Sequence, residues 1–186
     1  MDTSRLTRFE RFVYKHATTR ATVIAAIVLA VVVIVNFSVY FAVFLPLTDG
    51  TAYMELNVGY LPSDLFDFAE AYGEEGRNLY VTLSSTLDVA VPFCAATLLA
   101  LIGCRLGAHE GVGSVALLRT ALIASVCACL SDWSENASMI WLLTSYPTQN
   151  LTAAVLARIM TSIKYVSMII AIAVIIIEAV RLHRTT

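Results

Sequence analysis

The stretch ATVIAAIVLAVVVIVNFSVYFAVFL, residues 21–45, contains no charged side chain over 25 consecutive positions. A helix of about 20 apolar residues is long enough to cross the hydrocarbon core of a bilayer. The stretch is also longer than the apolar segment of a secretory signal peptide, which runs to about 15 residues. We therefore interpret it as a retained membrane span, which makes the chain an integral membrane protein.

Three more apolar stretches of similar length follow, at residues 79–104, 115–143 and 151–180. The chain of 186 residues is 59% hydrophobic and 14% charged, whereas soluble domains carry roughly 25% charged residues. Because the second and third connections are short, successive spans are expected to be neighbours. The predicted fold is all-α, a polytopic membrane protein built as an antiparallel bundle of four transmembrane helices, with the lipid bilayer as its main partner.

The basic residues predict the orientation of these spans. Five of them precede the first span, and the long first connection holds one arginine against seven acids. Cytoplasmic loops of membrane proteins carry an excess of Lys and Arg. Both termini are therefore predicted to be cytoplasmic, in a multi-pass protein of the cell membrane. The predicted cytoplasmic parts are residues 1–20, 105–114 and 181–186, and the predicted external parts are residues 46–78 and 144–150.

The external connection contains LPSDLFDFAEAYGEEG at residues 61–76, which has the pattern of a short amphipathic helix. Ser63 or Asp64 is expected to cap its start, and Gly73 is expected to end it. We predict a helix over residues 62–73 at the outer mouth of the bundle. Two roles are given equal weight for this helix: a lid over the bundle, or a helix that only shortens the loop. The apolar face consists of Leu65, Phe66, Phe68, Ala69 and Tyr72.

Five charged side chains lie between the outer third and the middle of the predicted spans, although each costs roughly 2.5–3.5 kcal/mol at the centre of a membrane helix. A rise of about 1.5 Å per residue places all five between the outer third of the bilayer and its midplane. Pairing inside the bundle removes most of this cost, so we predict that they face one another. The five are Asp88 in the second span, Asp132 and Glu135 in the third, and Arg158 and Lys164 in the fourth.

The third span carries DWSEN at residues 132–136, whose first, fourth and fifth residues share one helix face. We predict that Lys164 is the counter-ion of this face, with Asp88 close by. The polar side chains that could extend this cluster are Asn36, Ser84, Ser85, Thr86, Ser131, Ser134, Thr161 and Ser162. Three acids against two bases leave a formal charge of −1, so one acid is able to bind a proton or meet a cation. The predicted ion- or ligand-binding residues are Asp88, Asp132, Glu135, Asn136, Arg158 and Lys164.

Cysteine usage argues against one class of enzyme. Four-helix thiol oxidases need accessible pairs of cysteines, whereas the four cysteines here lie in or at the ends of the spans. The chain has no nucleotide-binding motif, metal-ligand cluster or nucleophilic triad. No cofactor, metal or nucleic acid is therefore predicted to bind.

Several short patterns resemble a family of small bacterial four-span membrane proteins without a known activity. LYVTLSSTLDVAVP at residues 79–92 carries an "LD…P" pattern, DWSEN carries a "D..EN" pattern, and a lysine stands in the last span. The resemblance covers most of residues 60–170. It implies a four-helix fold in a bacterial inner membrane, but it implies no activity.

Three classes of function fit these features. The first is a transporter, channel or binding protein for a proton, a small cation or a lipid-like ligand, as a homo-oligomer because four helices enclose little space. The second is an intramembrane enzyme that acts on a lipid-like substrate with carboxylates as proton donors, as a sterol isomerase does. The third is a structural or accessory subunit with an internal ion-pair lock. Intramembrane ionisable groups are functional by default, so the first class is predicted, and no catalytic residue is assigned.

Overall fold

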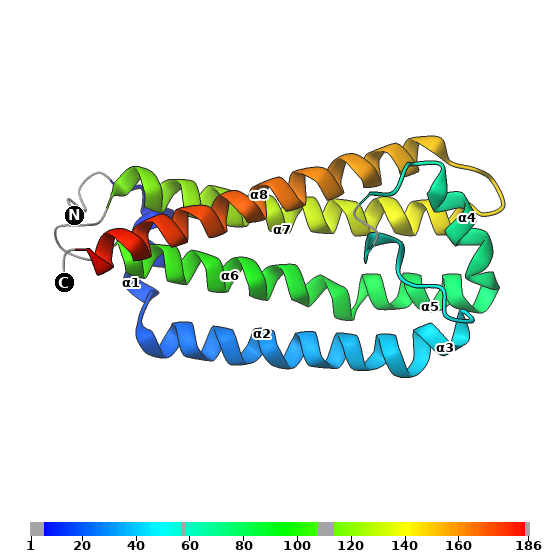
Figure 1. Ribbon diagram of the computed structural model, residues 1–186, viewed down its shortest axis with the longest axis horizontal. Coiled ribbons are helices and arrows are strands. Elements are labelled where there is room, and N and C mark those ends of the chain that lie inside the picture. The colour runs from blue at the N-terminus through cyan, green and yellow to red at the C-terminus, as the bar shows by residue number, and fades with distance from the viewer. Residues whose placement is uncertain (1–5, 57–58, 108–113, 185–186) are drawn as a thin grey trace. The chain divides into compact units, whose positions relative to one another are not determined.

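The computed structural model describes residues 6–56, 59–107 and 114–184. In these residues the chain is 85% helical and contains no strand, which confirms the predicted all-α class. Four helical segments are long and apolar enough to cross a membrane, and they are the long helices labelled in Figure 1. The four segments are Thr19–Leu47, Gly73–Gly107, Val115–Thr144 and Leu151–His183.

The described residues form a succession of helices. The predicted spans 115–143 and 151–180 correspond closely to α7 and α8. In chain order the elements are α1 (Arg8–His16), α2 (Thr19–Val39), a π-helical turn (Tyr40–Phe44), α3 (Leu45–Leu47), a 3-10 turn (Met54–Leu56), α4 (Asp64–Ala71), α5 (Gly73–Ser85), α6 (Leu87–Gly107), α7 (Val115–Thr144) and α8 (Leu151–His183). The predicted cytoplasmic connection 105–114 lies mostly outside the described residues.

The chain forms two compact units, each built from several separate segments. The first unit comprises Met1–Ala30, Phe93–Cys129 and Lys164–Thr186, and the second comprises Val31–Pro92 and Leu130–Ile163. The buried apolar cluster of the first unit consists of Leu6, Cys104, Leu118 and Leu122. The cluster of the second unit is larger and rich in aromatic rings.

Aromatic rings from distant parts of the chain meet in the second unit. The ring of Phe44, at the end of the π-helical turn, lies 4.3 Å from Tyr53 and 5.0 Å from Tyr72, measured between centroids. Tyr72 in turn stacks on Tyr80 of α5 at 5.8 Å. Such pairs add about 0.5–1.5 kcal/mol each beyond the area they bury. The end of the first span, the following connection and α5 are therefore held as one packed body.

The first span ends in a π-helical turn that has a local cause. The N–H of Leu45 donates to the carbonyl of Tyr40, five residues earlier. Pro46 follows, which has no N–H and whose ring collides with the carbonyl four residues before it in a regular helix. A widened turn moves that carbonyl aside. The chain then reverses at Asp49 and Gly50, whose φ angles are 51° and 84°.

The amphipathic helix predicted over residues 62–73 is α4, which covers Asp64–Ala71. The Ser63 side chain makes no capping hydrogen bond, whereas the Asp64 carboxylate accepts the N–H of Leu61 at 2.8 Å. The side chains buried from this segment are Leu65, Ala69 and Tyr72, at i, i+4 and i+7. Phe66 and Phe68 are half-buried and pack against the same buried cluster, so all five residues of the predicted apolar face contribute to the packed side of this segment.

The second span begins earlier than predicted and is divided in two. Gly73, with φ of 63°, ends α4 as predicted, but α5 starts at the same residue instead of at residue 79. The helix then breaks at Thr86, whose φ and ψ are −124° and −80°. Pro92 lies further on, inside α6.

The break at Thr86 follows a run of hydroxyl side chains. Thr86 donates to the carbonyl of Thr82 at 2.6 Å, and Ser85 donates to the carbonyl of Val81 at 2.7 Å. Hydroxyls that bond back to the preceding turn compete with the backbone ladder and bend helices. The break leaves α6 with an N-terminus of its own.

Close packing at Gly76 gives a first prediction. A Cβ atom at this position of α5 would lie 2.8 Å from the Thr48 methyl and 3.2 Å from the Tyr72 Cβ. Gly76→Ala is therefore expected to lower the free energy of unfolding by about 1–3 kcal/mol through overpacking, measured by denaturant titration in micelles. Glu75→Ala, at the exposed neighbouring position, should change it little. An unchanged stability for Gly76→Ala would show that α5 does not approach Thr48 this closely.

Candidate functional site

The carboxylate of Asp88 is bound by amide groups from two other helices. Its Oδ2 accepts from the Asn136 side chain of α7 at 2.8 Å, and its Oδ1 accepts from the Asn36 side chain of α2 at 3.3 Å. Asp88 stands in the first turn of α6, where the helix macrodipole favours a negative charge. The break at Thr86 thus places the partial positive charge of a helix end beside this carboxylate.

Only one of the two polar groups of the Asn136 side chain makes a hydrogen bond in the described part of the chain. Its amide N–H group binds Asp88, but its Oδ1 atom is buried without a hydrogen-bond partner in the described part of the chain. A buried acceptor left in this way costs about 1–3 kcal/mol. The oxygen is therefore a place where a ligand could donate a hydrogen bond or a cation could be held.

The indole of Trp133 joins α7 to the first turns of α6. Its Nε1–H donates to the Val89 carbonyl at 3.0 Å. Pro92 has no N–H, so within α6 the carbonyl that loses its helical donor is that of Asp88, four residues earlier. The Trp133 bond therefore ties α7 to the residue that follows Asp88.

Glu135, next to Asn136 in sequence, takes part in a separate chain of hydrogen bonds. Its Oε1 lies 2.7 Å from the hydroxyl of Thr161 on α8, and that hydroxyl lies 2.7 Å from the Tyr60 hydroxyl. Glu135 and Thr161 are 0% exposed and Tyr60 is 1% exposed. Three groups that carry or accept protons are thus aligned in the interior of the second unit.

The hydroxyl of Thr161 has more possible hydrogen-bond acceptors nearby than its single proton can bind. It also lies 2.9 Å from the Ala157 carbonyl, one turn earlier in α8. A hydroxyl donates one hydrogen bond and accepts up to two. It donates to the carboxylate when Glu135 is ionised, and it donates to Ala157 while accepting from the carboxyl when Glu135 is protonated. The same three atoms therefore accommodate both protonation states of Glu135 without a change of position.

The remaining predicted residues are placed in different ways. The Arg158 guanidinium lies 5.3 Å from the centre of the Tyr60 ring, so it is on the same side of α8 as this chain of hydroxyls. Asp132 is half-buried on α7. Lys164, with its amine 5.4 Å from the Tyr165 ring centre, is counted with the first unit. Its predicted pairing with Asp132 and Glu135 stays a prediction.

Tyr60 is the site residue that sequence reasoning missed. It follows the 3-10 turn in the connection between the first two spans, and its hydroxyl bonds to a residue 101 positions later. The chain has eight tyrosines, and no local pattern distinguishes this one. Only the folding of the connection onto α8 places its hydroxyl beside Thr161.

In the residues that the structure describes, no group of three or more His, Cys, Asp or Glu side chains is arranged to hold a metal ion. Comparison with protein-family models, with curated proteins and with solved structures finds no match for the chain. The chemistry of the site is therefore the basis for a functional proposal.

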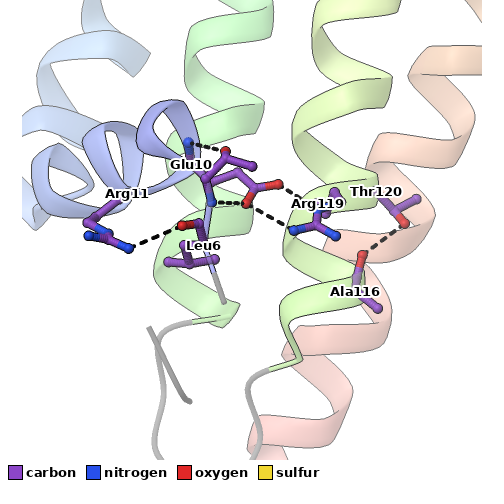
Figure 2. A network of polar contacts seen from close by, with 7 residues as sticks. Leu6, Glu10, Arg11, Ala116, Arg119 and Thr120 are labelled. Carbon is purple, nitrogen blue, oxygen red and sulfur yellow. Dashed lines mark hydrogen bonds and ion pairs between the residues drawn. The ribbon is translucent and has the colours of Figure 1, made fainter. Parts of the chain in front are cut away.

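A second polar network, in the first unit, joins α1 to α7 (Figure 2). Arg119 forms two hydrogen bonds to Glu10, Nε to Oε1 at 2.6 Å and Nη2 to Oε2 at 3.2 Å. Glu10 also closes a capping box with Thr7, in which each backbone N–H donates to the other side chain. The hydrogen bond from Arg119 is the largest influence on Glu10 and lowers its pKa from 4.5 to about 2.

This shift predicts a dependence of stability on acid. A carboxylate with a lowered pKa stabilises the folded state above the pKa of the unfolded chain, and the contribution is lost as the pH falls. The difference in stability between the wild type and Glu10→Gln should therefore be constant above about pH 4.5 and vanish towards pH 2. Thermal unfolding in micelles across this range measures it. A difference that persists at pH 2 would contradict the role of the ion pair.

Glu178, near the end of α8, is an acid that sequence reasoning did not single out. It is 1% exposed, and neither of its carboxylate oxygens has a hydrogen-bond partner within residues 6–56, 59–107 and 114–184. A Cβ atom added to Gly107 would lie 3.1 Å from its Oε1, so the glycine leaves room for this carboxyl group. Sequence reasoning missed Glu178 because it stands in a long apolar run. The side of α8 on which it lies becomes clear only when α6 is packed against that helix.

Proposed function

We propose that this protein is a four-span membrane protein that binds a proton at Glu135 and carries protons through the Tyr60–Thr161–Glu135 chain. In this proposal the spans form an antiparallel bundle with both termini cytoplasmic, α4 lies outside the membrane, and the protein belongs to the cell membrane. The observation that carries the proposal is the row of three buried groups joined by two hydrogen bonds of 2.7 Å.

The closed character of the site supports a proton as its ligand. All three members of the chain are less than 2% exposed, so the space around them does not suit a hydrated ion or a polar headgroup. A hydroxyl between a phenol and a carboxyl accepts a proton on one side and releases one on the other. Thr161 is placed to do this, because its oxygen lies 2.7 Å from both neighbours.

The Asp88 group has a supporting role in this proposal. Its carboxylate joins α2, α6 and α7 through Asn36 and Asn136, and so it holds the helix face that carries Glu135 in register. The unused oxygen of Asn136 and the charge of Asp88 also favour a positive charge nearby. Asp88 is therefore a positioning residue, whereas Glu135 is the group that takes up the proton.

Proton movement through reconstituted vesicles tests the proposal. The protein is inserted into vesicles that hold a pH-sensitive dye, and a pH gradient is imposed with a potassium ionophore to prevent charge build-up. The wild type is expected to collapse the gradient faster than empty vesicles, and Glu135→Gln is expected to abolish this difference. Thr161→Val and Tyr60→Phe should slow it, because each removes one hydroxyl from the chain.

Glu74→Gln is the matched control, since Glu74 is an exposed acid of α5, and it should behave as the wild type. Flux that is equal in the wild type and in Glu135→Gln would contradict the proposal. A wild type that moves no protons, in vesicles where the protein is shown to be inserted, would favour a structural lock instead.

A further inference from the structure

The inner face of α1 packs against the rest of the first unit. Glu10 is 6% exposed and is bound by Arg119. Val13 and Tyr14, three and four residues further on, pack against the buried cluster around Leu118. These contacts fix the rotation of the helix, so the side chains on its other face are turned away from the protein.

The outer face of α1 combines a basic stripe with an aromatic one. Arg8, Arg11 and Lys15 stand at i, i+3 and i+7 and are all exposed. Phe9 and Phe12 form the adjacent stripe and are 59% and 62% exposed. Glu10 is the only acid of this helix. Because it is turned inward and neutralised by Arg119, the outer face carries positive charge alone.

The position of α1 in the chain brings this face close to a membrane. Two residues separate His16, the last of α1, from Thr19, the first of α2. The three Cα–Cα steps from His16 to Thr19 reach about 11 Å at most. In the part of α2 that belongs to the first unit, Val23, Ile24 and Ile27 are at least half exposed, as expected of a surface that faces lipid. If α2 crosses the bilayer as proposed, a helix tied so closely to its start is expected near the bilayer surface.

We propose that the outer face of α1 binds the phosphate groups of anionic phospholipids in the bilayer that the chain crosses. The proposal rests on the proposed membrane insertion. Arg and Lys recognise phosphate oxygens through charge-assisted hydrogen bonds. Phe9 and Phe12 enter the boundary between headgroups and acyl chains, as the apolar side chains of interfacial helices do. The ion pair with Arg119 holds Glu10 on the inner face of α1 and neutralises its charge. The outer face therefore carries no carboxylate that would repel the lipid phosphate.

Fluorescence quenching by brominated lipids tests the inference at α1 itself. Trp133→Phe, Trp141→Phe and Phe12→Trp leave one tryptophan, at position 12, in the chain. The protein is placed in mixed phosphatidylcholine and phosphatidylglycerol vesicles, in which one lipid or the other carries bromine at equal mole fraction. Quenching by brominated phosphatidylglycerol is expected to exceed quenching by brominated phosphatidylcholine. Because salt screens exposed charges, about 0.5 M salt should reduce this excess.

A matched pair of variants separates charge from shape. Arg8→Gln with Lys15→Gln should reduce the enrichment of the anionic lipid by up to about fivefold for each residue, since each basic group near an anionic surface gains about 1 kcal/mol. Arg8→Lys with Lys15→Arg keeps both charges and should keep the enrichment. Arg11 is left unchanged because it also donates to the Leu6 carbonyl.

Equal quenching by the two lipids, or an excess that the neutralising pair does not reduce, would overturn the inference. Failure of membrane insertion is recognised separately with the wild-type chain, because neither lipid would then quench Trp133 and Trp141, which are 37% and 47% exposed on α7. If the substituted chain does not fold, the comparison is repeated on the chain that keeps its native tryptophans. Native mass spectrometry then counts how many molecules of each lipid stay bound. Equal retention of both lipids there would also overturn it.

Discussion

Thr161→Val is expected to lower the free energy of unfolding by about 1–3 kcal/mol, the cost of leaving buried polar groups without a hydrogen bond. Valine has nearly the shape of threonine, so packing is kept while the hydroxyl between Tyr60 and Glu135 is removed. The loss is measured by reversible unfolding in mixed micelles. It should be accompanied by slower proton movement in vesicles.

Two variants serve as controls for this result. Thr161→Ser keeps the hydroxyl and should recover most of the stability and of the proton movement. Ser162→Ala removes the neighbouring hydroxyl, which is exposed and bonds only to the Arg158 carbonyl of its own helix, and should change little. If Thr161→Val and Ser162→Ala lower the free energy of unfolding by the same amount, the buried chain of hydroxyls contributes no more to stability than an exposed hydroxyl does.

Asn136→Ala is the second change with a large expected effect. It removes the 2.8 Å hydrogen bond to Asp88, and hydrogen bonds to charged groups contribute about 1.5–3 kcal/mol. Asn36→Ala removes a longer bond of 3.3 Å to the same carboxylate and should cost less. Both losses are read from the same unfolding titration.

The coupling between Asn136 and Asp88 is measured by a double-mutant cycle. Asp88→Asn in the Asn136→Ala background removes the charge that has lost its donor, so the double variant should be more stable than the sum of the single losses predicts. Losses that simply add would show that the two side chains do not interact, and the placement of Asp88 between two amides would then be wrong.

The sequence predicts the long helices well because their signal is local. An uncharged run such as residues 21–45 is long enough to span a bilayer whatever its neighbours are. The spacing of Glu135 and Asn136 within DWSEN also predicts, without tertiary information, that both are presented near one side of α7. Asp88 was expected close to this face, and the structure places it 2.8 Å from Asn136.

The contacts that sequence reasoning missed depend on residues far apart in the chain. Tyr60 meets Thr161 across 101 positions, and Glu10 meets Arg119 across 109. Each pair forms only after separate helices have packed. The break at Thr86 was missed for another reason. Proline is the familiar cause of a kink, whereas this break follows hydroxyl side chains that compete for backbone hydrogen bonds.

Infrared difference spectroscopy on the reconstituted protein tests most directly whether Glu135 takes up a proton. The carbonyl stretch of a protonated carboxyl group is distinct from that of a carboxylate and responds to its hydrogen bonds. Lowering the pH is expected to produce a band in the wild type that is absent in Glu135→Gln and shifted in Thr161→Val, because Thr161 lies 2.7 Å from the carboxyl oxygen. Spectra of the wild type and Glu135→Gln that are identical across the titration would contradict the proposed proton site.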